Sequence, residues 1–342
     1  MSGREPHWWY SARPHWQTTL LSPFATIVGA VAAARLAKPP SYRSRLPVIC
    51  VGNFTVGGSG KTPLALLIAR LVAEAGREPW FLTRGYGGKV AGPLHVEPSV
   101  HGSNDVGDEP LLLTRRAPTV VSRDRVAGAK TIEAAASPRA AIIMDDGLQN
   151  PYLAKDLVVA VISGDRGFGN GRVIPAGPLR APLSKQIGLA DLIVVTGQDG
   201  SKTSDLVQRL RPMTGSPIIS ATTRAAKSAE AFRGRRVIAF AGIANPQRFF
   251  SMLESLGSVI VERRVFADHH AFHDREARDL IDAARRTSAD LVTTEKDLAR
   301  LSGRTGACAE LRDRSTALAI ETNFEESDLA ILKDKIGAVL GR

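Results

Sequence analysis

Hydrophobic positions follow two different spacings along most of the chain. From Leu46 onward, short apolar runs alternate with stretches in which apolar residues recur every three or four positions. The runs are typical of buried strands and the repeats of amphipathic helices. Predicted strands in the first part are 47–51, 80–82, 119–121, 141–144, 157–162 and 192–196, with helices at 62–75 and 125–136. Strands separated by helices favour a parallel sheet flanked by helices.

A polar stretch at 222–234 is the best internal boundary, and a second α/β series follows it. Its predicted strands are 237–241, 259–265, 291–294 and 317–320, with helices at 246–256, 275–287 and 326–340. The sequence therefore predicts a larger α/β domain over 43–226 and a smaller α/β lobe over 227–342. A cleft between two such lobes suits a reaction that joins two substrates.

The first 42 residues differ from the rest in pattern. Three of the four tryptophans precede a fifteen-residue apolar run, 20–34, which Arg35 and Lys38 close. The run is shorter than the roughly 20 residues that span a bilayer, and a secretory signal would place its positive charge first. Tryptophan prefers the headgroup level, and basic residues prefer anionic cytoplasmic surfaces. We expect a monotopic membrane-associated helix; a helix packed on the following domain is the alternative.

Composition narrows the class of protein. The hydrophobic fraction of 44% and the charged fraction of 23% exclude a disordered chain. Two cysteines, Cys50 and Cys308, cannot form a disulfide framework or a four-thiolate zinc site, so a reducing cytoplasmic setting is expected. A net charge of +11 favours an anionic partner. No zinc-finger spacing or RNA-binding aromatic signature accompanies it, so we expect no nucleic acid partner.

A glycine-rich loop follows the first predicted strand and precedes a helix. Glycines let backbone N–H groups surround phosphate oxygens, and the helix N-terminus adds a favourable dipole. Lys61 is placed to reach the terminal phosphates of a nucleotide, and the Thr62 hydroxyl suits Mg²⁺. The general pattern has glycine six residues before the lysine, where this chain has Thr55. The predicted nucleotide-binding residues are Thr55, Val56, Gly57, Gly58, Ser59, Gly60, Lys61 and Thr62.

Two acids end the apolar strand 141–144. A carboxylate at such a strand end can hold Mg²⁺ beside bound phosphates, so Asp145 and Asp146 join Thr62 as candidate metal ligands. Capping of the next turn is the alternative role for these acids.

Asp108 and His269 are the candidates for proton transfer. Asp108 lies just before an apolar helix, where acids are favoured as helix caps. Phosphoryl transfer to a hydroxyl also needs a carboxylate that orients the acceptor, so Asp108 remains a catalytic candidate. His269 lies in a histidine-rich segment, in which His269 and His273 would chelate a metal if they shared a helix.

Several motifs occur in a fixed order along nearly the whole chain. They are GNFTVGGSGKTP at 52–63, TRGYG at 83–87, VGDEP at 106–110, DDGLQ at 145–149, PAGPLR at 175–180, FAGIA at 240–244, DHH at 268–270 and TTEKD at 293–297. In this order, behind an aromatic N-terminal segment, the chain resembles the lipid A 4'-kinase (tetraacyldisaccharide 4'-kinase) family.

The resemblance implies a P-loop kinase of the lipid A pathway, on the cytoplasmic face of the inner membrane. Such an enzyme moves the γ-phosphoryl group of ATP to the 4'-hydroxyl of an acylated glucosamine disaccharide 1-phosphate, with Mg²⁺ and without an obligate protein partner. It implies that Lys61 and Thr62 bind nucleotide and metal, that Asp145 and Asp146 assist, and that Lys61, Asp108 and His269 are catalytic.

One departure from the family pattern and three arginines bear on this expectation. Many members of the family carry an acid after the PAGPLR motif, where this chain has Ala181. Arg84, Arg123 and Arg180 lie in or near the motifs and are candidates to meet anionic groups of the substrate.

Three other functions compete with a kinase. A GTPase-type switch would need an Asn/Thr-Lys-x-Asp element, and 294–297 comes close but has Glu295 between threonine and lysine. A DHH-type phosphoesterase would need further metal-binding aspartate motifs and no phosphate loop. A structural membrane adaptor would not need Lys61.

Overall fold

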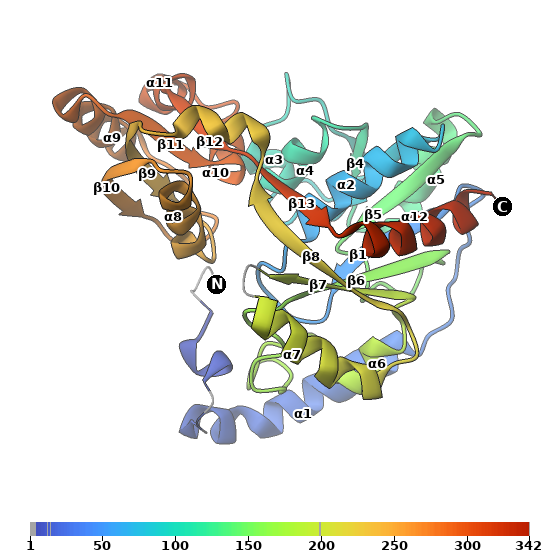
Figure 1. Cartoon of the computed structure of the whole chain (residues 1–342). Helices are drawn as coiled ribbons and strands as arrows, with labels where there is room; N and C mark the ends of the chain where they lie inside the picture. The colour runs from blue at the N-terminus through green and yellow to red at the C-terminus, as the bar shows by residue number, and fades with distance from the viewer. Residues whose placement is uncertain (1–4, 12, 14, 198–199, 342) are drawn as a thin grey trace.

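Two sheets of different size organise the chain (Figure 1). The computed structural model describes residues 5–11, 13, 15–197 and 200–341. The larger sheet has nine strands in the order β13-β8-β7-β6-β1-β5-β2-β4-β3, and the smaller has four in the order β10-β9-β11-β12. The predicted α/β class with a second, smaller lobe is confirmed.

The larger sheet is parallel through its centre. Its strands are β1 (Val48–Asn53), β2 (Glu78–Thr83), β3 (Leu94–His95), β4 (Thr119–Val121), β5 (Ala140–Asp145), β6 (Leu157–Ser163), β7 (Leu192–Gly197), β8 (Ile218–Ala225) and β13 (Ile320–Phe324). β1 pairs in parallel with β5 and β6, and all its residues are buried. A strand covered on both faces needs no polar alternation, which explains its continuous apolar run.

Helices cover both faces of this sheet. The helices of the larger lobe are α2 (Lys61–Glu74), α3 (Ser103–Val106), α4 (Asp108–Leu113), α5 (Arg125–Ala135), α6 (Leu183–Ile187), α7 (Gly200–Leu210) and α12 (Glu326–Leu340), with the 3₁₀ turn η2 (Arg211–Met213). Apolar side chains of α2 and α12 share one core with the sheet, and those of α5, α6 and α7 form the core on the opposite face. Buried apolar area of this kind is the main stabilising contribution to a fold.

The smaller lobe has its own two cores. It contains β9 (Arg236–Ala241), β10 (Val259–Val265), β11 (Asp290–Thr294), β12 (Ser315–Leu318), η3 (Lys227–Phe232), α8 (Pro246–Ser255), α9 (Asp274–Thr287), α10 (Glu295–Arg300) and α11 (Gly306–Arg314). Side chains of α8 and η3 pack on one face of its sheet, and those of α9 and α11 on the other.

An antiparallel ribbon, β8 with β13, joins the two lobes (Figure 1). The predicted boundary at 222–234 therefore holds the end of β8 and the turn η3. The sequence also assigned everything after 227 to the smaller lobe, but β13 and α12 return to the larger one. The sequence predicts one strand at 317–320, where the structure has the end of β12 and the start of β13. The helix predicted at 326–340 is present as α12, and the pattern carries no signal for the sheet to which β13 returns.

The N-terminal segment forms the turn η1 (His7–Tyr10) and the helix α1 (Trp16–Leu36), which lies apart from both sheets (Figure 1). At 21 residues α1 is longer than the fifteen-residue run in the sequence, and by length and composition it could cross a membrane. Ala25 and Gly29 are its buried residues, and Gly29 faces Val173 and Pro182.

The opposite side of α1 carries an exposed apolar stripe. Its members recur every three or four positions and therefore share one face: Trp16, Leu20, Phe24, Ile27 and Val31. Each of these side chains is at least 60% exposed. A contiguous exposed apolar surface on a helix that packs on the body by its other face marks an interaction surface.

Candidate functional site

The phosphate loop connects β1 to α2, as its sequence predicts. Gly57 and Gly60 have φ values of 90° and 85°, a backbone region that favours glycine. Val56 N–H donates to the Pro178 carbonyl at 2.9 Å, and the Thr196 hydroxyl donates to the Ser59 carbonyl at 3.1 Å. These bonds fix the loop from two neighbouring segments.

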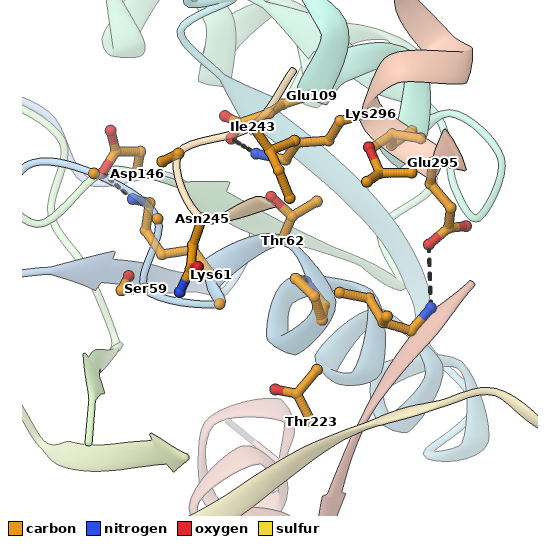
Figure 2. Close-up of a pocket in the computed structure, with 18 of the residues that line it drawn as sticks. Ser59, Lys61, Thr62, Glu109, Asp146, Thr223, Ile243, Asn245, Glu295 and Lys296 are labelled. Carbon is orange, nitrogen blue, oxygen red and sulfur yellow. Dashed lines mark hydrogen bonds and ion pairs between the residues drawn. The ribbon is translucent and has the colours of Figure 1, made fainter. Parts of the chain in front are cut away.

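A cavity of about 1170 Å³ opens beside this loop and is lined by both lobes. Its walls include the loop from Val56 to Thr62, together with Ile243, Asn245, His269 and Lys296 of the smaller lobe. Figure 2 shows Ile243 and Asn245 of the smaller lobe among the lining residues, together with Lys61 and Thr62 of the larger lobe. Of the predicted nucleotide-binding residues, Thr55 is not in the wall; its carbonyl accepts from Arg180 Nε at 3.0 Å.

The two acids after the predicted strand lie at the end of β5, and their environments differ. Asp146 lines the cavity between two cations, 3.6 Å from Lys61 Nζ and 3.0 Å from Arg180 Nη1. Burial alone would raise the pKa of Asp146, yet Lys61 and Arg180 hold it well below its usual range. Asp146 is thus an ionised group that ties Lys61 to Arg180.

Asp145 is fully buried, and neither carboxylate oxygen has a hydrogen-bond partner among the described residues. Burial, followed by the negative charges of Glu109 and Asp146, raises the pKa of Asp145 to about 7. Unpaired buried carboxylate oxygens are costly, and a cation beside them would remove that cost. Among the described residues, no group of three or more His, Cys, Asp or Glu side chains forms a metal cluster.

Asp108 and His269 come together from the two lobes. Asp108 begins α4 and is 4% exposed, and its Oδ2 lies 3.4 Å from Nδ1 of His269. The hydrogen bond to Asp108 raises the pKa of His269 above its ordinary value, against the effect of burial. His269 lines the cavity, whereas Asp108 lies behind it and outside the lining. The sequence offers both residues as candidates for proton transfer; the structure brings them into contact and places His269 at the cavity.

His269 occupies a tight turn between β10 and α9, with a φ of 57°. Such a conformation is uncommon for a residue with a side chain, and strain of this kind concentrates at functional sites. His273 lies just before α9, and His270 pairs with Glu276 at 2.8 Å. His269 and His273 therefore do not share a helix, and the chelating pair considered from their spacing is not formed.

The three arginines that the sequence offers as candidates lie in two different cavities. Arg84 and Arg180 line the main cavity. Arg123 instead lines a smaller cavity of about 490 Å³ near the end of α1, together with Arg35 and Arg125. Ala181 is fully buried and is absent from the lining of the main cavity.

Several residues that shape the site have no role assigned to them from the sequence. Lys296 Nζ donates to Glu109 at 2.6 Å across the lobes (Figure 2), and Arg300 binds Asp108. Arg166 pairs with Glu5 at 2.6 Å, which brings the N-terminal segment to the cavity beside Gly57. The TTEKD motif pointed to Lys296, but Arg166 and Arg300 belong to no motif and carried no signal.

Comparison with known proteins identifies the family to which the chain is similar. Residues 17–337 match the family model described as tetraacyldisaccharide-1-P 4'-kinase. A tetraacyldisaccharide 4'-kinase of Methylobacterium radiotolerans is 49% identical over 87% of this chain and 89% of its own length. One from Methylobacterium nodulans is 45% identical over 98% of this chain and 96% of its own length.

A solved structure supports the same assignment. The fold is similar to LpxK of Aquifex aeolicus, a structure described as a complex with ATP, with a TM-score of 0.71. The identity is 26%, and the match covers 94% of this chain and 99% of the other. The ordered motifs, the two-lobed cavity and these matches agree, and the chain belongs to the tetraacyldisaccharide 4'-kinase family.

Proposed function

We propose that this protein transfers the γ-phosphoryl group of ATP to the 4'-hydroxyl of an acylated glucosamine disaccharide 1-phosphate at the cytoplasmic face of the inner membrane. The observation that carries the proposal is the cavity, in which a phosphate loop from one lobe faces His269 from the other. A site with an anion cradle on one wall and a proton acceptor on the other suits phosphoryl transfer to a hydroxyl.

Nucleotide binding falls to the larger lobe. The backbone N–H groups of the loop and the N-terminus of α2 offer donors and a positive dipole to phosphate oxygens. Lys61, held 3.6 Å from Asp146, turns its ammonium to the terminal phosphates when nucleotide binds. Positioning and charge stabilisation provide most of the rate enhancement in this class of reaction.

Mg²⁺ fits the donors beside the loop. Thr62, the second residue of α2, and Asp146 line the cavity. Asp145 is fully buried outside the lining, and its two oxygens have no hydrogen-bond partner among the described residues. Magnesium is commonly held by one or two carboxylates together with substrate phosphates rather than by an all-protein cage. We assign Thr62, Asp145 and Asp146 to it. When bound, it would neutralise charge on the phosphates.

The Asp108–His269 pair takes the proton of the acceptor hydroxyl. A sugar hydroxyl has a pKa far above 7, so its attack on phosphorus benefits from a group that orients it and takes the proton late. His269 supplies the contact with the cavity, and the ionised Asp108 behind it stabilises the protonated imidazole. The pair is expected to titrate as a unit.

The exposed stripe of α1 supports docking at a membrane surface. Apolar residues on one face, tryptophans at the N-terminal end, and Arg35 and Lys38 after the helix are typical of an interfacial helix at an anionic leaflet. A lipid substrate would then reach the cavity without leaving the membrane surface.

The competing functions lack structural support. The Thr294–Asp297 segment, which approaches a guanine-recognition motif, is engaged internally: Asp297 is buried against Gly242 N–H, and Lys296 is paired with Glu109. A phosphoesterase metal cluster is absent from the described residues. An adaptor without catalysis would not require the buried Asp108–His269 contact.

The test is direct assay of the full-length protein. Purified protein is incubated with γ-labelled ATP, Mg²⁺ and a detergent-dispersed acylated disaccharide 1-phosphate, and label in the lipid is measured. The proposal predicts transfer to the 4'-position and preference for ATP over GTP. Label released as inorganic phosphate, with none in the lipid, would refute it.

A further inference from the structure

The two lobes contact each other through α4 and α10, next to the catalytic pair. Two ion pairs connect these helices, Asp108 with Arg300 and Glu109 with Lys296, both at 2.6 Å. Lys296 lines the cavity, whereas Arg300 lies outside its lining and is 7% exposed. Arg300 is thus a buried cation that does not belong to the cavity wall.

Arg300 holds one oxygen of the Asp108 carboxylate. Its Nε and Nη2 donate to Oδ2 of Asp108 at 2.8 and 2.6 Å, and His269 approaches the same oxygen. The other oxygen, Oδ1, accepts from the backbone N–H of Glu109 at 3.0 Å. With donors on both oxygens, the carboxylate plane is fixed rather than free to rotate.

The guanidinium of Arg300 is also held by residues of its own lobe. Its Nη1 donates to Asp297 at 2.6 Å and to the Gly242 carbonyl. Asp297, which is fully buried, also accepts from Gly242 N–H and from the Thr294 hydroxyl. The three side-chain nitrogens of Arg300 therefore bind groups in both lobes, and a single lysine ammonium could not reach all of them.

The Gly242 carbonyl connects this network to His269. It accepts from the backbone N–H of His269 at 3.1 Å as well as from Arg300. A Cβ on residue 242 would lie 3.0 Å from the Ala267 carbonyl oxygen and 3.0 Å from Oδ1 of Asp297. The close packing at Gly242 keeps Arg300 and the strained turn of His269 in a fixed relation.

We propose that Arg300 is a positioning residue for the phosphoryl transfer, which aligns the Asp108 carboxylate with the His269 imidazole when the two lobes meet. This inference rests on the proposed function and adds to it a residue that acts through Asp108. Arg300 comes from the same lobe as His269, so the catalytic pair and its support are assembled at one contact between the lobes.

The electrostatics around Asp108 are consistent with this role. Asp108 is faced by His269, Arg300 and Lys296, while Asp268, Asp297 and Glu109 are the nearby acids. Burial alone would raise the pKa of Asp108, but His269, Arg300 and Lys296 hold it well below its usual range. Arg300 lowers the pKa of His269 as well as that of Asp108, so loss of the arginine charge would raise both and move the acid limb of the kcat profile, set by His269, to higher pH.

The first test uses Arg300→Lys, with Arg304→Lys as its matched control. Arg304 is in the same lobe and donates to the Phe272 carbonyl at 2.9 Å, away from Asp108. Misplacement of a catalytic group by about 1 Å can cost about 10²-fold, so R300K should lower kcat by about that factor. KM for ATP should change little, and R304K should leave kcat unchanged. A near-normal kcat for R300K would overturn the proposal.

The second test separates positioning from folding. In an Asp108→Ala background, R300K should lower kcat no further, because the group it positions is gone. Arg300→Met should in addition move the acid limb of kcat to higher pH. An equal loss from R300K with and without Asp108, or an acid limb that stays in place, would overturn the proposal. A wild-type protein that fails to label the lipid would refute the proposed function itself, whereas an active wild type with an active R300K refutes this inference alone.

Discussion

Two walls of the cavity, one formed by the phosphate loop and the other by His269 with Asp108 behind it, are built in different ways. The loop follows β1 directly, and its lysine and threonine begin α2, so its parts are close in sequence. Asp108 and His269 are 161 positions apart by residue number and belong to different lobes. One wall is formed within a single lobe, and the other exists where the lobes touch.

Because of this difference, we expect nucleotide binding and turnover to depend on different parts of the molecule. A loop fixed within the larger lobe can hold phosphate whatever the position of the smaller lobe. The catalytic pair needs the contact between α4 and α10, so changes there should affect turnover more than nucleotide affinity.

The largest effect is expected at the phosphate-loop wall. Lys61→Ala removes the ammonium that meets the terminal phosphates, and turnover should fall by several orders of magnitude with the fold intact. Steady-state kinetics and circular dichroism measure the two quantities. Lys333→Ala, at an exposed position of α12, is the control. Near-normal turnover of the Lys61 variant would contradict the assignment of this wall.

At the other wall, Asp108→Ala and His269→Ala should each lower kcat by about 10²–10⁴-fold, the usual contribution of a general base. Because the two side chains act together, the double variant should lose far less than the product of the single losses. Asp108→Asn and His269→Gln serve as variants of matched shape. Fully multiplicative losses would mean two independent roles, and an unaffected Asp108→Ala would leave that residue as a helix cap.

Many parts of the site can be predicted from the sequence, because a motif within one short segment determines the local structure of that segment. The loop, the strand-end acids and most strands are predictable, since each depends on residues within one short segment. The return of β13 to the larger sheet and the contact of Arg300 with Asp108 depend on residues far apart in the chain. The different environments of Asp145 and Asp146 depend on Arg180, which also lies outside their segment, 34 positions further along the chain.

Substitutions in a third region, the exposed apolar stripe on α1, should affect membrane binding and turnover of the lipid substrate but not ATP binding. Replacing Leu20, Phe24 and Ile27 together by serine should weaken binding to anionic vesicles by about tenfold or more for each side chain that enters the membrane. Turnover of the lipid should fall, and ATP affinity should stay unchanged. Vesicle sedimentation measures the first quantity. Val100→Ser with Val259→Ser, at exposed sites away from α1, is the control. Unchanged sedimentation of the triple variant would show that α1 does not dock to membranes.

The smallest effect concerns pH and stability. The pKa of His269 is raised, so its contact with Asp108 stabilises the fold fully below the ordinary histidine value and is lost as pH rises through the raised value. The pKa of Asp108 is lowered, so the same contact fails only in strong acid. His269→Gln should therefore lower the unfolding midpoint more at about pH 6 than at about pH 9. An equal effect at both pH values would exclude a charged contact.

The most direct test measures ATP affinity and kcat together for Lys61→Ala, Asp108→Ala and His269→Ala. Binding of a fluorescent ATP analogue gives the first quantity, and label transfer to the lipid gives the second. We predict that Lys61→Ala loses both, while the other two variants keep wild-type affinity and lose turnover. Loss of ATP affinity in Asp108→Ala as large as its loss of turnover would contradict the division of the cavity into a binding wall and a proton-transfer wall.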